Sequence, residues 1–278
     1  MSQSWTLLAV LRWTTDFFAE KGVPNPRLDA EYILAHVLGL QRLDLYLRYA
    51  QPLTQPERTA IRELVVRRAN REPLQHILGE VEFLDRRIKV DRRALIPRSE
   101  TEFLAQRILD ECPQAGCALD VCTGSGAIAI ALAGRIECVT GTDISGEALA
   151  LARENAALNG VEVTFLQGDL LAPVQGVFDV IVCNPPYVTE EEFDNLEPEL
   201  TMYEPRLALV AADGGLACYR RLVTEAVPHL ARGGRVYLEI GHQQGELVRQ
   251  MAQDAGWTVL DVAKDLAGFD RYVVLARL

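Results

Sequence analysis

The pattern of apolar positions changes character near Pro73. Over residues 1–72, apolar side chains recur three and four positions apart, as they do from Leu7 to Phe18, and this spacing predicts amphipathic helices. Residues 54–57, Thr-Gln-Pro-Glu, form a capping box with proline in the first turn and predict the start of another helix. The first part of the chain is therefore expected to be a small helical bundle.

Beyond residue 100, short apolar runs alternate with helical stretches. Alternation of this kind is typical of βαβ units and predicts an α/β fold with a doubly wound, mostly parallel sheet. The seven predicted strands are residues 118–121, 138–142, 161–166, 179–183, 235–240, 258–262 and 271–275. Only residues 263–270 join the last two strands, and no crossover helix fits there, so one of the two is expected to run antiparallel.

Between the two parts, residues 81–84 and 87–90 alternate around Asp85 and Arg86, which predicts a linking β-hairpin. The expected domains are a helical docking domain at 1–74, the hairpin linker at 75–95 and the α/β domain at 96–278.

The composition is that of a folded globular protein, with 49% apolar and 24% charged residues. No apolar run approaches the roughly 20 residues that cross a bilayer. The first twelve residues have no basic stretch ahead of an apolar core, so no signal peptide is expected. The six cysteines include no C-x-x-C pair, so no metal site is expected. Free thiols suit a reducing compartment, and a cytoplasmic protein is predicted.

The net charge of −11 is unevenly spread. Residues 1–96 contain 15 Lys/Arg and 12 Asp/Glu, a net charge of +3, whereas residues 97–278 contain 13 Lys/Arg and 27 Asp/Glu, a net charge of −14. Because Lys and Arg supply most of the affinity for a phosphate backbone, the acidic second part argues against a stable nucleic-acid partner.

A glycine-rich loop follows the first predicted strand of the sheet. Gly124 and Gly126 lie in residues 120–126, Asp-Val-Cys-Thr-Gly-Ser-Gly, and allow a sharp turn close to a ligand. In doubly wound sheets, ligands bind beyond the carboxyl ends of the strands, where this loop is expected. The loop also fits the G-x-G-x-x-A dinucleotide fingerprint, so on its own it leaves NAD open.

Acidic residues end the next two predicted strands. Asp143 can accept hydrogen bonds from two ribose hydroxyls, and Asp169 can accept one from the adenine amine. No residue of this set dictates a pyrophosphate partner, and carboxylates suit a nucleoside that carries a cationic sulfonium. The set therefore favours S-adenosylmethionine over a dinucleotide.

The fourth predicted strand runs directly into Asn184, Pro185, Pro186 and Tyr187, the most specific signal in the chain. An NH2 group on a conjugated carbon is a poor nucleophile because its lone pair is delocalised. The Asn184 side-chain oxygen and the Pro185 carbonyl can each accept a hydrogen bond from this NH2 group and so turn the nitrogen toward a methyl donor. Tyr187 can lie flat against the planar amide or base. Catalysis would then be largely positioning.

These motifs resemble a known group. Asp-x-x-x-Gly-x-Gly followed by Asn-Pro-Pro-Tyr resembles the signature of class I S-adenosylmethionine-dependent amino-methyltransferases. Residues 95–102, Leu-Ile-Pro-Arg-Ser-Glu-Thr-Glu, are similar to the Pro-Arg-Pro-Glu-Thr-Glu segment of the release-factor glutamine methyltransferases, the PrmC/HemK family. Residues 72–79, 203–209 and 238–245 resemble further segments of that family.

The resemblance implies a seven-stranded methyltransferase sheet with an antiparallel last strand, behind a helical substrate-docking domain. It implies S-adenosyl-L-methionine as methyl donor, S-adenosyl-L-homocysteine as product, and N5 of the glutamine in the Gly-Gly-Gln motif of peptide-chain release factors as acceptor. No membrane partner is expected, and the chain is expected to be a monomer. The implied cofactor residues are Asp120, Val121, Cys122, Thr123, Gly124, Gly126, Asp143, Asp169, Leu170 and Asn184. The implied catalytic and substrate-binding residues are Asn184, Pro185, Pro186 and Tyr187.

The chain departs from the family pattern at three positions: Ser99 replaces a usual proline, Cys122 a frequent glycine, and Leu170 a frequent aromatic residue. Glu204 and Arg206 are candidates for a buried pair or for substrate contacts. The alternatives are a ribosomal-protein glutamine N5-methyltransferase, an adenine N6-methyltransferase acting on nucleic acid, and a non-catalytic binding protein. An NAD oxidoreductase would leave Asn-Pro-Pro-Tyr without a role.

Overall fold

A computed structural model describes residues 5–277 of the chain. The chain divides into two compact units, Met1–Gly79 and Glu80–Leu278. Within residues 5–277, no helix is both long enough and apolar enough to cross a membrane.

The first unit is the predicted helical bundle. Its helices are α1 (Leu7–Glu20), α2 (Pro26–Leu38), α3 (Arg42–Leu47), α4 (Gln55–Ala69) and α5 (Leu74–Leu78). Leu7, Leu11 and Phe18 are fully buried in its core, as their helical spacing predicted. The predicted capping box is confirmed at the start of α4, where the Thr54 backbone N–H donates to Glu57 at 2.7 Å.

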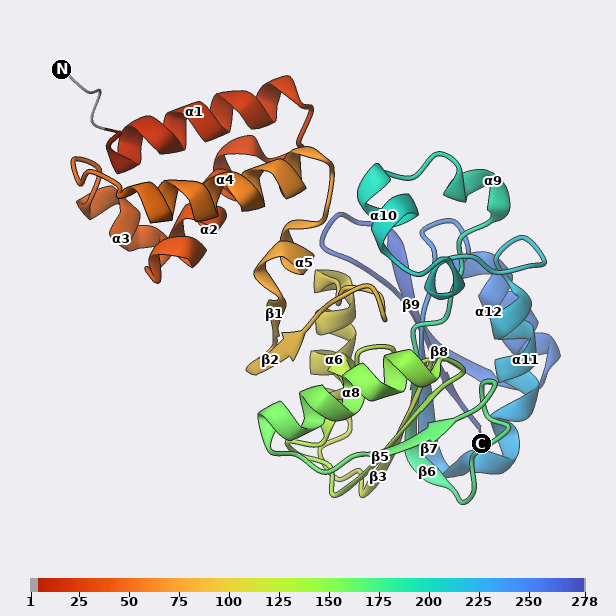
Figure 1. Cartoon of the computed structure of the whole chain (residues 1–278). Coiled ribbons are helices and arrows are strands. Elements are labelled where there is room, and N and C mark those ends of the chain that lie inside the picture. Colours follow the sequence, from red (N-terminus) through yellow and green to blue (C-terminus); the bar gives the residue numbers. More distant parts are fainter. Residues whose placement is uncertain (1–4, 278) are drawn as a thin grey trace. The chain divides into compact units, whose positions relative to one another are not determined.

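The second unit contains the predicted seven-stranded sheet, and Figure 1 shows its strands between layers of helices. The strands are β3 (Cys117–Val121), β4 (Cys138–Asp143), β5 (Thr164–Gln167), β6 (Phe178–Cys183), β7 (Leu230–Glu239), β8 (Thr258–Lys264) and β9 (Asp270–Ala276). Their order is β5-β4-β3-β6-β7-β9-β8. The sheet winds one way from β3 through β4 and the other way through β6, so the switch point lies at β3.

The prediction that one of the last two strands runs antiparallel is confirmed. β9 pairs antiparallel with both β7 and β8, and the other neighbouring strands pair parallel. The predicted start of the third strand at Val161 is wrong. The Val161 N–H bonds back to Ala156 O at 3.1 Å and closes the preceding helix through left-handed Gly160, so pairing begins only at Thr164.

Helices cover both faces of the sheet. On one face α6 (Ser99–Glu111), α7 (Ala127–Leu132) and α8 (Gly146–Asn159) pack against residues such as Ala118 and Val180. On the other face α11 (Ala217–Glu225) and α12 (Gly245–Asp254) pack against Leu119 and Ile181. Neighbouring strand residues thus point to opposite cores, and both faces are buried, as parallel sheets require.

The predicted hairpin is present as β1 (Glu80–Phe83) and β2 (Arg86–Lys89). Phe83 and Ile88 are buried in the same core as α6 and α7. Asn155 on α8 accepts from Lys89 N at 2.8 Å and donates to Lys89 O at 3.1 Å, which satisfies the edge of β2. The hairpin is therefore part of the second unit's hydrophobic core.

Candidate active site

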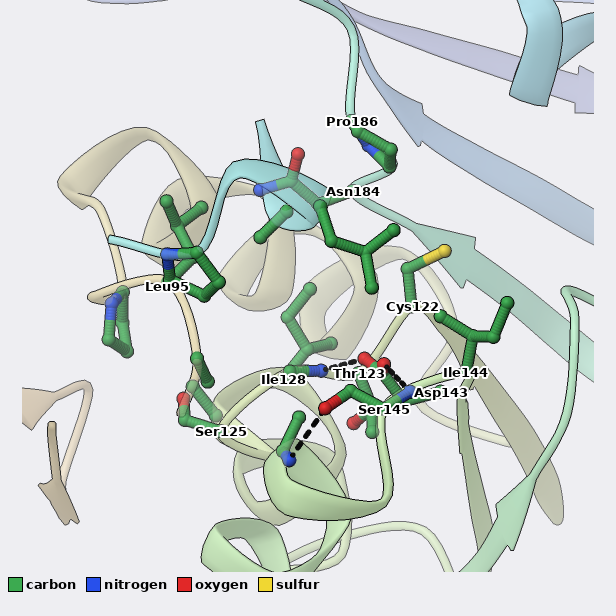
Figure 2. A pocket seen from close by; sticks show the side chains of 18 of the residues that line it. Leu95, Cys122, Thr123, Ser125, Ile128, Asp143, Ile144, Ser145, Asn184 and Pro186 are labelled. Atoms are coloured by element: carbon green, nitrogen blue, oxygen red, sulfur yellow. Dashed lines mark hydrogen bonds between the residues drawn. The ribbon is translucent and has the colours of Figure 1, made fainter. Parts of the chain in front are cut away.

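A cavity of about 220 Å³ lies at the carboxyl ends of β3, β4 and β6, the place where doubly wound sheets bind ligands. Seven of the ten predicted cofactor residues line it, together with Pro186. Those seven are Cys122, Thr123, Gly124, Asp143, Asp169, Leu170 and Asn184. In Figure 2, Asn184 and Pro186 lie at one end of the cavity, and Ser125 and Ser145 lie toward the other.

Asp120 lies beneath the glycine-rich loop and does not line the cavity. Its Oδ2 accepts from Thr123 Oγ1 at 2.6 Å and from Ala129 N at 3.1 Å, so it ties the loop to α7. Burial raises the pKa of Asp120 to about 7. Val121 and Gly126 are likewise buried outside the lining, and their contribution is to the path of the loop.

Asp143 connects the loop after β3 to the start of α8. Its Oδ2 accepts from Gly124 N and its Oδ1 from Ser145 N, each at 2.9 Å. Burial raises the pKa of Asp143, while the backbone donors from Ser145 and Gly124 oppose that shift. Each carboxylate oxygen retains a second lone pair, so Asp143 can still accept a hydrogen bond from a hydroxyl group of a ligand.

The backbone of the loop explains two residue types. Gly124 has a φ of +56°, and a Cβ there would meet only Ala94 Cβ, at 3.9 Å, so it would project into space that a ligand can use. Cys122 has a φ of +60°, a left-handed conformation that favours glycine and accounts for the glycine expected there by resemblance. Its side chain lines the cavity (Figure 2).

Asp169 and Leu170 follow β5 and line the cavity. Asp169 is exposed and forms an ion pair with Arg221 at 2.7 Å, so its carboxylate already has a partner. Leu170 is buried with a φ of +49°, and its carbonyl accepts from Thr142 Oγ1 at 3.0 Å. It presents an apolar surface to the cavity where the resemblance led us to expect an aromatic ring.

Asn184 is the polar residue that the end of β6 brings to the cavity. Its side-chain nitrogen donates to Thr101 Oγ1 on α6 at 3.1 Å. The protein thereby engages the amide nitrogen and leaves the amide oxygen available to accept from a ligand. Pro186 lines the cavity, whereas Pro185 is buried beside it and Tyr187 packs into the core under α11 and α12. Burial raises the pKa of Tyr187 to about 12.

Contacts beyond the motif hold this segment in place. Gln244 donates to Tyr187 O at 3.0 Å and accepts from Gly241 N at 3.0 Å. Gly215 passes so close that a Cβ would lie 2.2 Å from Tyr187 O, so only glycine fits there. The chain after Asn184 is therefore confined on two sides.

Glu204 joins two segments that line the cavity. It follows α10 (Pro198–Tyr203) and is buried, accepting from Ile96 N at 3.0 Å and forming an ion pair with Arg98. Leu95, Pro97 and Arg98 line the cavity from one segment, and Pro205, Leu207 and Ala208 line it from the other. Of the two roles left open for Glu204 and Arg206, the buried pair is wrong, because Arg206 forms an exposed ion pair with Glu190.

We expect Glu204→Gln to weaken cofactor binding and lower the free energy of unfolding by about 1–3 kcal/mol. In the glutamine variant an NH2 group replaces one carboxylate oxygen. That group would donate toward either the Ile96 N–H or the Arg98 guanidinium, which are themselves donors. Urea unfolding and calorimetric titration with S-adenosylhomocysteine measure the two effects. Glu191→Gln, which neutralises an exposed carboxylate on α9 (Glu190–Phe193), is the control, and equal losses in both variants would contradict the assigned role.

Comparison with known proteins identifies the family. Residues 9–79 match the model of the PrmC N-terminal domain, and residues 99–201 match that of the methyltransferase small domain. A release factor glutamine methyltransferase from Geobacter sulfurreducens is 43% identical over 97% of this chain and 96% of its own. One from Deinococcus radiodurans is 41% identical over 95% of this chain and 96% of its own.

The chain belongs to the release factor glutamine methyltransferases. Solved structures agree with this at the level of the fold. A methyltransferase from Pyrococcus furiosus superposes with a TM-score of 0.54 at 20% identity, over 69% of this chain and 89% of its own. The ribosomal protein L11 methylase of Lactobacillus delbrueckii superposes with a TM-score of 0.50 at 26% identity, over 66% of this chain and 81% of its own.

Members of this methyltransferase family use S-adenosylmethionine, and the cavity fits it. The site combines a backbone that approaches closely at Gly124, a carboxylate at Asp143 for hydroxyl groups, and apolar walls for a flat ring. Sequence reasoning missed several of the wall residues. They are Thr101, Ser125, Ile128, Ile144, Ser145, Ala148 and Cys218. Three of them carried a sequence signal. Thr101 lies in the 95–102 segment, Ser125 lies in the glycine-rich loop, and Ser145 caps α8 two residues after Asp143.

Proposed function

We propose that this release factor glutamine methyltransferase transfers a methyl group from S-adenosylmethionine to N5 of the glutamine in the Gly-Gly-Gln motif of peptide-chain release factors. The observation that carries the proposal is the Asn184 amide, whose nitrogen is held by Thr101 while its oxygen remains free to accept beside the cavity. A glutamine side chain presents the conjugated NH2 group that such an acceptor would orient.

Asn184 Oδ1 and the Pro185 carbonyl would each accept one hydrogen bond from the glutamine NH2 group. With both N–H groups held, the plane of the amide is fixed and the open face of the nitrogen would point toward the methyl donor. Bound S-adenosylmethionine supplies a methyl carbon activated by the sulfonium. Attack would form the N–C bond as the S–C bond breaks, and S-adenosylhomocysteine would leave. The nitrogen would then be cationic and its proton acidic enough to be lost to solvent, so no strong base is required at the start. The contribution of the site is then positioning, which can supply about 7–11 kcal/mol.

For the cofactor, we propose that Asp143 accepts from the ribose hydroxyls while Ile144 and Leu170 cover the adenine ring. Ile144 is an exposed apolar residue directly after Asp143 and lines the cavity. Asp169 would reach the adenine amine only by sharing its carboxylate with Arg221. Asp120 would act indirectly, by holding Thr123 and the start of α7.

We further propose that the helical unit docks the release factor. It carries an apolar groove lined by residues such as Trp13, Phe17 and Val66, with Arg58 and Arg62 beside them. Trp13 stacks on Phe17 and remains about half exposed. We also propose that the enzyme is a monomer in the cytoplasm. All six cysteines are free thiols, which a reducing compartment maintains.

The experiment combines the purified enzyme, methyl-labelled S-adenosylmethionine and purified release factor, followed by peptide mass spectrometry. We expect label on the glutamine of the Gly-Gly-Gln motif. Parallel reactions contain ribosomal proteins or nucleic acid in place of the factor. Label in either of those, with none on the factor, would support glutamine methylation of a ribosomal protein or adenine methylation instead.

A further inference from the structure

The amide of Asn184 can orient a substrate only if its oxygen, and not its nitrogen, faces the cavity. The two ends of an amide have nearly the same shape, so packing alone does not choose between them. The choice depends on whether the partner behind the amide accepts or donates a hydrogen bond. That partner is Thr101 Oγ1, 3.1 Å from Asn184 Nδ2.

The Thr101 hydroxyl has a second partner on the sheet. It lies 2.7 Å from Glu239 Oε2 at the end of β7, and both side chains are buried, with 5% and 2% of their residue surfaces exposed. An ionised carboxylate only accepts hydrogen bonds, so the single hydroxyl proton of Thr101 is committed to Glu239. Thr101 must then accept from Asn184, which has to present its NH2 group.

We propose that Glu239 and Thr101 are positioning residues that act through this chain of hydrogen bonds to keep the Asn184 oxygen facing the substrate. The inference rests on the proposed function of Asn184. Neither residue is among the site residues that the sequence motifs indicated, and Glu239 does not line the cavity. Its influence on the substrate would pass entirely through Thr101.

The surroundings of Glu239 hold it rigidly. Tyr219 on α11 donates to the Glu239 backbone carbonyl at 2.8 Å, which fixes the end of β7. The titratable groups that face the carboxylate are Arg98 and Glu100 at the start of α6, Arg271 and Tyr272 on β9, Tyr187 after β6, and Tyr219. Burial dominates over the attraction of the two arginines and raises the pKa of Glu239 to about 7.

That ionisation gives the chain of hydrogen bonds a pH dependence. Above pH 7, Glu239 is ionised and accepts from Thr101. As the pH falls through about 7, the protonated carboxyl can donate to Thr101, and the Thr101 hydroxyl can donate to Asn184 in turn. The amide is then no longer compelled to present its oxygen, so methyl transfer should slow on the acidic side.

The test compares Thr101→Val, which keeps the side-chain shape but has no hydroxyl, with Thr101→Ser, which keeps the hydroxyl. We expect single-turnover methyl transfer to release factor to fall about 10- to 100-fold in Thr101→Val and to stay near the wild-type rate in Thr101→Ser. Thr101 also lines the cavity, so S-adenosylhomocysteine affinity, measured by calorimetry, should change far less than the rate in Thr101→Val. Equal rates in the two variants, or a parallel loss of cofactor affinity, would overturn the proposal.

The second arm follows the single-turnover rate from pH 6 to 8.5. The wild-type rate should rise through about pH 7, whereas Glu239→Gln should be slower and should lack that rise, because glutamine can both donate and accept and does not titrate. A wild-type rate without this ionisation, or a Glu239→Gln variant that retains it, would overturn the proposal. If the wild-type enzyme transfers no methyl group to release factor, the proposed function itself fails. Transfer by the wild type without the expected differences between variants would instead overturn only the positioning role.

Discussion

Replacing Asn184 by alanine is expected to lower the rate of methyl transfer by about 10³-fold or more, while leaving the fold and cofactor affinity nearly intact. The variant loses the acceptor that would hold one proton of the substrate nitrogen, and positioning is the main contribution of this site. The backbone of the loop would persist, because Gln244 and Gly215 confine Tyr187 independently of the Asn184 side chain. Single-turnover assays with labelled S-adenosylmethionine measure the loss.

The matched control is Asn195→Ala, which removes an exposed asparagine whose side chain donates to Glu191 O at 2.8 Å. It should methylate at the wild-type rate. Circular dichroism and calorimetry with S-adenosylhomocysteine show whether each variant is folded and binds cofactor. Transfer by Asn184→Ala within tenfold of wild type would show that the nitrogen is oriented by other groups.

The second large effect is expected for Asp143→Ala, which should weaken cofactor binding about 100-fold. The substitution removes the acceptors of two backbone N–H groups, at Gly124 and Ser145, and also the proposed acceptor for the ribose. Bonds to a charged group contribute about 1.5–3 kcal/mol each, and a loss near 3 kcal/mol corresponds to that change in Kd. The dissociation constant for S-adenosylmethionine, measured by calorimetry, tests this directly.

Asp194→Ala provides the comparison, because it removes an equal charge from an exposed position at the end of α9. Its cofactor affinity should match that of the wild type. If Asp143→Ala binds S-adenosylmethionine as tightly as Asp194→Ala does, Asp143 neither shapes the loop nor contacts the ribose. If the rate falls without any change in affinity, its role lies in the transfer step.

Local patterns were sufficient to predict most of the fold. Strands such as β3 and β6 are apolar except for one aspartate each, because both faces of a parallel sheet are buried. A connection too short for a helix predicted that one of the last two strands runs antiparallel, and the structure shows that this strand is β9. The error at Val161 arose because an apolar run can belong to the end of a helix, and the left-handed turn at Gly160 decided the outcome.

The predicted site was incomplete for a physical reason. Asn184 and Asp143 follow strands, so strand order alone brings them to one edge of the sheet. Thr101 lies far from them in sequence and reaches Asn184 through tertiary packing, which no local spacing encodes. Glu204 was a candidate from the sequence, but its bond to Ile96 also depends on tertiary packing. Tyr187 is partly buried and packs against the core that contains α11 and α12, and it is not among the residues that line the cavity.

The most direct test of the central claim is a crystal structure of the enzyme with release factor and S-adenosylhomocysteine. The account predicts that the glutamine nitrogen lies about 3 Å from both Asn184 Oδ1 and the Pro185 carbonyl, with its open face toward the sulfur of the cofactor product. A glutamine nitrogen held by other groups, or an Asn184 side chain that turns its nitrogen toward the substrate, would contradict it.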